Sequence, residues 1–281
     1  MATTGLPPAV DADVSRVTEV LGMITPRWNV QVLLALSVRP LRYTEIANKL
    51  SWLHSGQLHP KLRSLCEDGL VERTEHSVRH VTYGLTARGT ALLPVLPVIA
   101  AWGKEFLEEP DTPLSAIEHV EDSLTLLTRR HAPAILWALK SRDETSARAL
   151  ASIVMPGGLW TNIYPPLRQL TADALVVTAP GRPYRLSESG NALDAVFASL
   201  SAWAAGRPLA HASRHPIWGQ ADGDTPTAPQ TWVSAQSRLP APTVVPAPAG
   251  ATRPTWHNRD LFSHATPARP QVALRAGGVR R

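Results

Sequence analysis

Polar side chains that can contact nucleic-acid bases share one side of a predicted helix within residues 54–67. Leu58, Leu62 and Leu65 recur at helical spacing and predict its buried stripe, next to Cys66. The opposite side and its edges carry the candidate contacts: Ser55, Gln57, His59, Lys61, Arg63 and Ser64. Glutamine can pair with adenine and arginine with guanine in the major groove, whereas lysine suits phosphate. The alternative interpretation is an ordinary solvated helix face.

A second group of basic side chains follows this helix, in a segment that reads as a hairpin. Residues 70–74 and 80–85 can pair as two strands around a polar tip. We expect Arg73 and Arg79 to contact phosphate or the minor groove, together with His76 and His80. A hairpin that is merely solvated is the alternative.

Other chemistries receive little support from the sequence. Four histidines lie around the helix and hairpin, but they lack the tight spacing and cysteine partner of a zinc site, so we expect no metal. Neither a nucleophile elbow nor a phosphate loop nor a persuasive pair of carboxylates is evident, so we expect no catalytic residue, no cofactor and no enzyme activity. The single cysteine, Cys66, cannot form an internal disulfide, which is typical of a reducing cytoplasm.

The elements that position these residues occur twice along the chain. The corresponding segments are Trp28–Leu36 and His131–Leu139, Leu58–Leu65 and Ile163–Leu170, Tyr83–Gly89 and Tyr184–Gly190, and Trp102 and Trp203. Their offsets are 103, 105, 101 and 101 residues, so the order is kept and the gaps stay small. Two similar domains in one chain explain this pattern better than coincidence. The candidate contacts of the second copy are Asn162, Arg168 and Arg182.

We therefore divide the 281 residues into three parts. The first copy is assigned to residues 14–106 and begins with a helix over 14–24, and the second copy is assigned to 115–206. Each copy is predicted to contain several helices, a hairpin and a closing helix. The closing helix of the first copy runs from a Thr86 cap to Phe106. Residues 207–281 contain eleven prolines and few apolar side chains, so we expect this tail to be disordered.

The positive charge is unevenly distributed among these parts. The tail holds nine arginines and three aspartates, while residues 16–106 carry 11 basic and 7 acidic side chains. Residues 115–206 carry 8 of each. A polyanion should therefore meet the first copy and the tail before the second copy. The longest apolar run, residues 91–103, is too short for a membrane span, and the N-terminus lacks a signal pattern, so we expect a cytoplasmic protein without membrane contact.

The first copy resembles the HxlR family of bacterial transcription regulators, a branch near the MarR group. The resemblance rests on Trp28, Arg42–Ile46, Leu62–Val71, Val81–Gly89 and Trp102–Gly103. It implies a winged helix-turn-helix that binds double-stranded DNA at the bacterial nucleoid, and closing helices that help to build a dimer interface. Some family members sense oxidants through a cysteine near the N-terminus. No cysteine precedes Cys66, so that mechanism is not implied for this chain.

The helix predicted to contact DNA in each copy, called the recognition helix, contains prolines that depart from this pattern. Pro60 lies inside the first helix, and Pro165 and Pro166 occupy the matching place in the second. An interior proline costs about 3 kcal/mol and removes a helical hydrogen bond. We therefore expect Pro60 and Pro165 to lie in the first turn of shortened helices, with residues 55–59 forming a bent segment before the first one.

The fold class that follows is mainly α with small β-hairpin wings. Two tandem winged helix-turn-helix domains would form an intrachain pseudo-dimer, followed by the disordered tail. The chain would act as a sequence-specific transcription regulator, as a monomeric pseudo-dimer or as a homodimer, and a small-molecule effector is compatible with this function. The alternative is an interaction or ligand-sensing protein whose second unit has lost DNA binding. That unit has His131 in place of Trp28 and Ala174 in place of Gly69.

Overall fold

The computed structural model describes residues 4–77, 80–108 and 113–219. We call residues 8–106 the first half. Its elements are α1 (Pro8–Ile24), α2 (Asn29–Ala35), β1 (Leu41–Arg42), α3 (Tyr43–Lys49), α4 (Ser55–Glu67), β2 (Val71–Ser77), β3 (His80–Leu85), α5 (Ala87–Leu92), the 3-10 helix η1 (Leu93–Val95) and α6 (Leu96–Phe106). The chain therefore forms several short helices before one long hairpin.

We call residues 116–204 the second half. Its elements are α7 (Ala116–Leu127), α8 (Ala132–Arg142), β4 (Glu144–Thr145), α9 (Ala147–Val154), the 3-10 helix η2 (Trp160–Ile163), α10 (Tyr164–Ala172), β5 (Val176–Val177), β6 (Tyr184–Leu186), α11 (Glu188–Asn191) and α12 (Asp194–Ala204). A further 3-10 helix, η3 (Leu209–Arg214), follows. The two halves have the same sheet order, β1-β3-β2 and β4-β6-β5, and all strand pairs are antiparallel.

The hairpin of the first half is the wing that the sequence predicts. Val71 pairs with Leu85 at its base, and the register shifts between Glu75 and Ser77 near its tip. The third strand, β1, was not predicted, because its two residues have no pattern of their own and are ordered by pairing with β3. This pairing holds the start of α3 against the wing, since α3 begins directly after β1.

Both halves use a left-handed residue to pass from a helix into the wing. Gly69 has a φ of 68°, and Ala174 has a φ of 57° at the matching place. In each case the following backbone N–H returns to a carbonyl of the preceding helix, at 3.0 Å and 2.9 Å respectively. This is the turn expected from a glycine after a helix, although the second half makes it with alanine.

A side-chain hydroxyl caps the helix that follows each wing. Thr86 accepts a hydrogen bond from the Gly89 backbone N–H at 3.0 Å, and Ser187 accepts one from Gly190 at 3.0 Å. The predicted Thr86 cap is thereby confirmed. The closing helix is not continuous, however, because η1 separates α5 from α6 around Pro94. A proline at this position cannot donate the helical hydrogen bond.

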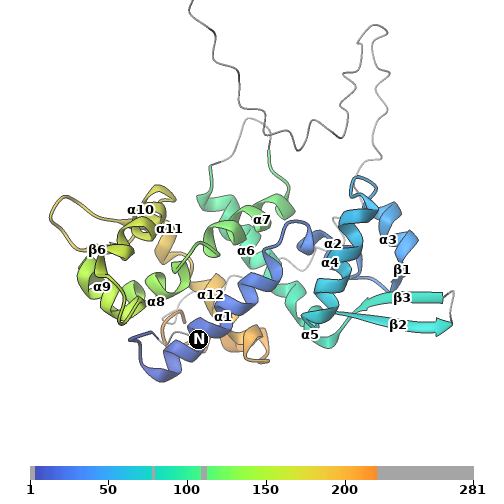
Figure 1. Cartoon of the computed structure of the whole chain (residues 1–281), viewed down its shortest axis with the longest axis horizontal. Helices are drawn as coiled ribbons and strands as arrows, with labels where there is room; N and C mark the ends of the chain where they lie inside the picture. Colours follow the sequence, from blue (N-terminus) through green and yellow to red (C-terminus); the bar gives the residue numbers. More distant parts are fainter. Residues whose placement is uncertain (1–3, 78–79, 109–112, 220–281) are drawn as a thin grey trace, which may run out of the picture. The chain divides into compact units, whose positions relative to one another are not determined.

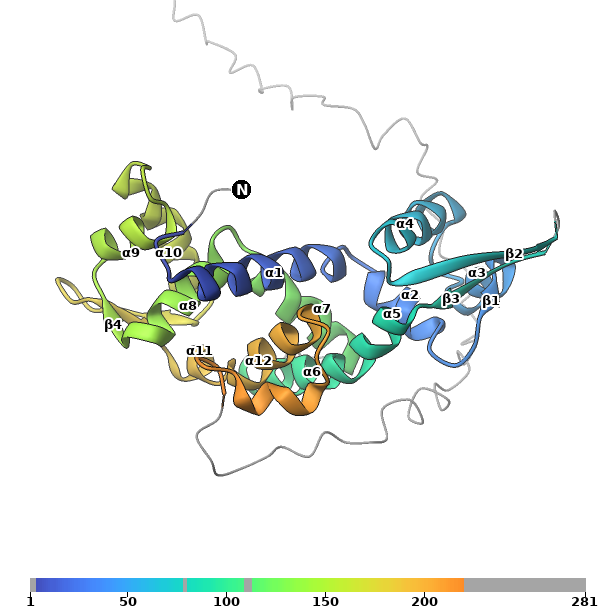
Figure 2. The same ribbon diagram turned by 90° about the horizontal axis from the view of Figure 1, so that it is seen from below.

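Four helices lie between the two sheets: α1, α6, α7 and α12 (Figures 1 and 2). Helix α1 packs against α8 and α12 of the second half, and α7 packs against α2 and α6 of the first. Two tryptophans form reciprocal hydrogen bonds across this layer. The Trp102 indole N–H donates to the Ser189 carbonyl at 3.0 Å, and that of Trp203 donates to the Arg88 carbonyl at 3.0 Å. The buried apolar side chains of both halves form one cluster.

Two boundary predictions need correction. Helix α1 begins at Pro8 rather than at residue 14. Residues 207–219 are not a disordered tail, because η3 lies within them and Trp218 is fully buried. The Trp218 ring packs on Trp137 and Phe197 at centroid distances of 5.1 Å and 4.8 Å. The remaining predicted tail, residues 220–281, lies outside the described residues.

Among the residues that the structure describes, none belongs to a helix with both the length and the apolar character needed to cross a bilayer.

Candidate nucleic-acid interface

Helix α4 has the two-sided pattern that the sequence predicts. Leu58, Leu62 and Leu65 are buried at 0–1% exposure. The other side of the helix is open to solvent, and the predicted contact residues on it are Ser55, Gln57, His59 and Arg63. Lys61 and Ser64 are half-buried at its edges. The leucines therefore fix which side of α4 is available to a ligand.

Pro60 is the sixth residue of α4 rather than part of its first turn. The prediction of a shortened first helix was therefore wrong, and residues 55–59 form helix instead of a bent segment. Leucines on both sides of the proline explain this result. Leu58 and Leu62 are both buried in the core, and their burial offsets the hydrogen bond that the proline cannot make.

Two of the basic residues on α4 already have acidic neighbours. The Arg63 Nε lies 2.8 Å from Glu67 Oε1, and this carboxylate raises the pKa of Arg63. Burial lowers the pKa of Lys61, and the negative charge of Glu121 on α7 acts in the opposite direction. Gln57, near the start of the helix, is by contrast an uncharged long polar side chain that is exposed.

Tyr43, at the start of α3, positions the first turn of α4. Its hydroxyl donates to the Ser55 carbonyl at 3.2 Å, and its ring lies 6.4 Å from that of His59. In the sequence, Tyr43 is recognisable only as part of a family motif, so its place at this surface was not predicted. Its position directly before Thr44 and Glu45, in the first turn of the preceding helix, was the available signal.

The wing carries charges of both signs. Arg73 on β2 contacts Glu75, which together with Tyr83 raises the pKa of Arg73. Glu72 is exposed on the same strand. Arg79 lies outside the described residues, so its predicted contact with DNA stays a prediction. The described part of the wing is therefore less basic than Arg73 alone suggests.

Two histidines lie side by side at the end of the wing. The rings of His76 and His80 are 4.9 Å apart, and the His76 Nε2 lies 3.1 Å from the Thr82 hydroxyl. The pKa of His80 is lowered by desolvation and by the positive charges of Arg42 and His76. Within the described ranges, no group of three or more histidine, cysteine or acidic side chains is arranged to hold a metal ion.

The second half presents a different surface at the matching place. Helix α10 has nine residues and begins with prolines in its first turn, so the shortened helix predicted there is confirmed. Asn162 lies in η2, Arg168 on α10 and Arg182 between β5 and β6, and all three are exposed. Their neighbours Leu159 and Trp160 are 72% and 46% exposed.

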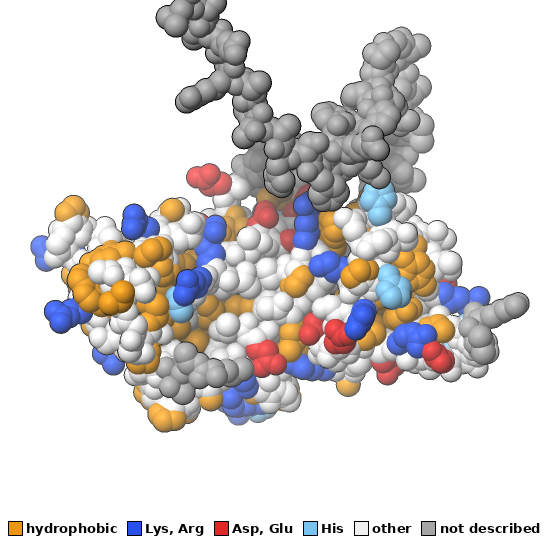
Figure 3. All heavy atoms as spheres, viewed as in Figure 1, with side chains coloured by type: hydrophobic (Ala, Val, Ile, Leu, Met, Phe, Trp, Pro, Cys, Tyr) orange, Lys and Arg blue, Asp and Glu red, His pale blue; other side chains and the backbone are white. Residues whose placement is uncertain are grey.

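The contrast between the halves is visible on one face of the molecule. In Figure 3, basic and acidic side chains alternate around the wing on the right, while apolar side chains gather over α9 and its neighbours on the left. Strand β5 has only two residues, against seven in β2, so the second half also has the shorter wing.

Comparison with known proteins places the first half in a family. The family described as HxlR-like helix-turn-helix matches residues 23–111. The HTH-type transcriptional regulator YodB of Bacillus subtilis is 33% identical over 93 residues, which cover 32% of this chain and 82% of that protein. The regulator YdzF of the same organism is 30% identical over 86 residues, covering 30% and 79%. The chain belongs to the HxlR-like helix-turn-helix family.

A third relative matches a longer stretch. It is described as an uncharacterized HTH-type transcriptional regulator, Rv3095 of Mycobacterium tuberculosis, and it is 31% identical over 140 residues. These residues cover 49% of this chain and 84% of that protein. The predicted resemblance is thereby confirmed for residues 23–111, and DNA binding and transcription regulation are the functions of the family.

Proposed function

We propose that this HxlR-like chain reads specific DNA sequences with α4 and holds the duplex with the β2–β3 wing. The observation that carries the proposal is the open side of α4, where Gln57 and Arg63 are exposed opposite the buried leucines. A helix with such a face can enter the major groove. Tyr43 supports it by fixing the first turn of α4 to α3. The role requires a location at the nucleoid, in the cytoplasm.

We further propose that the second half is a divergent copy of the first. Three features support this: the identical sheet order, the left-handed residue before each wing, and the hydroxyl cap after it. The reciprocal bonds of Trp102 and Trp203 add a fourth, because they relate the halves as two partners of a dimer. One chain would then be equivalent to a symmetric pair of winged helices.

The proposed domains of this pseudo-dimer are residues 14–106 and 115–206, with α1 extending the first to Pro8. Their unequal helices favour unequal half-sites. The first half supplies Gln57 and Arg63, and the second supplies Asn162 and Arg168 on a shorter helix. Two recognition helices of a family dimer lie about 34 Å apart along the duplex, one turn of DNA. We expect the stronger half-site under α4.

A second candidate function is that of a regulator whose second half binds no DNA. The exposed Leu159 and Trp160 beside α10 favour it, because apolar side chains at this place suit a protein surface better than a phosphate backbone. In that case the second half would serve contact with another protein or with a ligand.

Selection of preferred sequences from a random DNA pool tests these proposals. The variants Gln57→Ala and Arg63→Ala should change the preferred bases in one half-site, at a cost of about 1–3 kcal/mol of discrimination each. Asn162→Ala and Arg168→Ala should change the other half-site by less. Arg148→Ala, on the exposed side of α9, is the matched control. Unchanged preferences in both α4 variants would refute the assignment of the recognition helix.

Footprinting combined with a solution mass separates the two candidate functions. A monomer that protects two unequal half-sites one turn apart supports the pseudo-dimer. A monomer that protects one half-site supports a second half without DNA contact. A homodimer that protects two strong half-sites, related by symmetry, would show that two copies of α4 are needed from two chains.

A further inference from the structure

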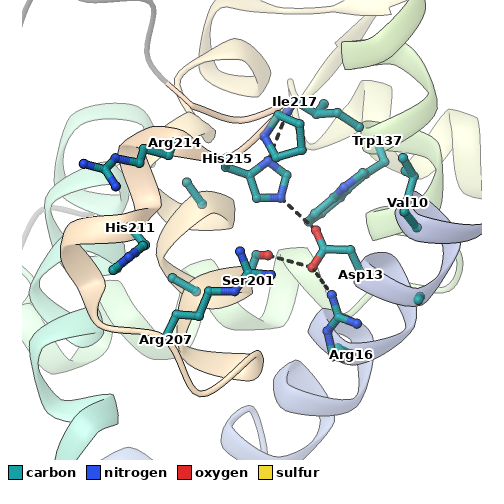
Figure 4. A pocket seen from close by; sticks show the side chains of 15 residues that line it. Val10, Asp13, Arg16, Trp137, Ser201, Arg207, His211, Arg214, His215 and Ile217 are labelled. Atoms are coloured by element: carbon teal, nitrogen blue, oxygen red, sulfur yellow. Dashed lines mark hydrogen bonds and ion pairs between the residues drawn. The ribbon is translucent and has the colours of Figure 1, made fainter.

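A pocket of about 460 Å³ lies apart from the proposed DNA interface, among α1, α12 and residues 207–217 (Figure 4). Its charged lining consists of three arginines and one aspartate, which leaves a surplus of two positive charges. These residues are Asp13, Arg16, Arg207 and Arg214. The predicted DNA contacts are not among its lining residues. The pocket therefore needs an explanation of its own.

The one carboxylate in the pocket is already occupied. Asp13 Oδ1 accepts hydrogen bonds from Ser201 at 2.6 Å and from Arg16 at 3.0 Å, and Oδ2 accepts one from His215 Nε2 at 2.8 Å. Burial raises the pKa of Asp13, but these hydrogen bonds, first that of His215, and the positive charge of Arg16 together bring it below its ordinary value. Asp13 thus stays ionised and holds the pocket wall together.

His215 adds no positive charge to the pocket in this arrangement. Its Nδ1 accepts the backbone N–H groups of Ile217 and Trp218, at 3.1 Å and 2.9 Å. An imidazole nitrogen that accepts hydrogen bonds carries no proton, so Nε2 carries the proton that is donated to Asp13. The ring is neutral, and its role is to hold residues 215–218 against α1.

Two arginines retain donors that the described residues do not use. Arg207 is exposed, and its guanidinium has no acidic partner among the residues of the described ranges. The Arg16 Nε is buried and has no acceptor in the same part of the chain. Figure 4 shows Arg16 and Arg207 extending from opposite sides toward Asp13 and Ser201, with Arg214 at the outer edge. A buried donor without an acceptor is costly, and a bound anion would supply one.

The rest of the lining is largely apolar. Val10, Ala198 and Ile217 contribute aliphatic surface, and Trp137 is fully buried. The Trp137 indole N–H also has no hydrogen-bond acceptor within the described residues. The pocket thus combines an apolar wall with a few polar donors, and its volume falls within the roughly 300–1,000 Å³ of small-molecule sites.

We propose that this pocket binds a small organic anion. Its carboxylate or phosphate group would lie between Arg16 and Arg207, and its apolar body would pack against Val10 and Ile217. Arginine suits this role because its planar fork can make two parallel hydrogen bonds to either group. The lining joins α1 of the first half to α12 of the second, so a ligand would bias their arrangement. That consequence rests on the proposed function, whereas binding itself does not.

Calorimetric titration of the full chain with benzoate, phenyl phosphate and neutral benzamide tests the proposal without DNA. We expect at least one of the two anions to bind saturably, one per chain, and to raise the melting temperature, and benzamide to do neither. Arg207→Gln should weaken that binding about tenfold or more, since a hydrogen bond to a charged group is lost. Arg148→Gln, an exposed arginine on α9, is the matched control and should bind like the wild type.

The binding results for the two anions and for the variants decide whether the proposal holds. Binding of phenyl phosphate alone identifies a phosphate site, and binding of benzoate alone identifies a carboxylate site; either supports the proposal. Failure of both anions to bind overturns it, as does equal binding of benzamide or an unchanged affinity in Arg207→Gln. The melting temperature of the unliganded Arg207→Gln variant should match that of the wild type, because the side chain has no described partner.

Discussion

Helices α4 and α10 occupy the same place in the two halves, yet their prolines lie at different positions within the helix. Helix α4 has 13 residues and continues through Pro60, whereas α10 has nine and starts with Pro165 and Pro166 in its first turn. The segment before α10 is the 3-10 helix η2. Helix α4 has its full length at a cost in backbone hydrogen bonding, whereas α10 avoids this cost because it is shorter.

This difference indicates that side-chain packing determines where a helix begins, even when the helix contains an interior proline. In α4, Leu58 lies before Pro60 and is fully buried, so unwinding the first turn would expose it. In α10, the matching Ile163 is also fully buried, but it lies in η2, so its burial does not require an α-helical turn. Both halves bury a side chain at the matching position, and they differ in the backbone around it.

The largest expected effect concerns a glycine found at the matching place in each half, Gly89 and Gly190. A Cβ atom added to Gly89 would lie 2.1 Å from the Leu70 carbonyl oxygen, and one added to Gly190 would lie 2.1 Å from that of Leu175. Alanine at either position should therefore destabilise the protein by about 2–4 kcal/mol, because the backbone must move. Urea unfolding of both variants measures this.

Gly22 supplies the control for these two variants. It lies within α1, and an added Cβ would meet nothing within 4 Å. Gly22→Ala should stabilise the protein by about 0.5–1 kcal/mol, since alanine is the better helix former. A large loss at Gly89 with none at Gly190 would break the proposed equivalence of the two halves.

The second prediction concerns the prolines themselves. Pro60→Ala restores a donor inside α4 and should stabilise the protein by about 2 kcal/mol, after allowance for the greater freedom of the unfolded chain. Pro165→Ala should give no gain, because the first turn of α10 has no helical acceptor for that donor. Thermal unfolding compares the two. Equal gains would mean that Pro60 and Pro165 are under the same constraint, against the difference described above.

Much of this architecture could be predicted from residue patterns. The leucine stripe of α4, the wing strands and the Thr86 cap depend on neighbours close in sequence. The burial of Trp218 could not be predicted, because it depends on Trp137 and Phe197, which are far away along the chain. The pocket proposed to bind an anion was not predicted for the same reason, because residues far apart along the chain line it.

The candidate DNA contacts were predicted only as residue types on a face. The exposure of Gln57 followed from helical spacing. The pairing of Arg63 with Glu67 could also be predicted, because residues four apart lie on the same side of a helix. The contact of Arg73 with Glu75 and the burial of Lys61 depend on packing that local patterns do not encode. Local periodicity therefore gives the direction of a side chain more readily than its partners.

A smaller effect is expected at the left-handed turns. Gly69→Ala should cost about 1 kcal/mol, because a side chain is disfavoured at a φ of 68°. Ala174→Gly should stabilise the protein by up to about 1 kcal/mol for the same reason, since Ala174 already has a φ of 57°. Urea unfolding of both variants should give shifts of opposite sign. Two losses would indicate that the Ala174 methyl group makes a packing contact worth more than its strain.

The smallest expected change concerns the wings, and it separates the halves on DNA. Arg73→Ala should reduce the magnitude of the slope of log affinity against log salt by about 0.9, the value for one lost phosphate contact, while Arg182→Ala, on the shorter wing, should reduce it by less. Glu75→Ala is the matched control, because it removes the carboxylate that contacts Arg73 and should strengthen binding at low salt. Fluorescence anisotropy on one duplex over a range of salt concentrations measures all three variants. Equal losses of slope for Arg73 and Arg182 would mean that both wings hold phosphate, and the short β5–β6 wing would then be a working part of the interface. An unchanged slope for Arg73→Ala would instead leave α4 to bind DNA without its wing.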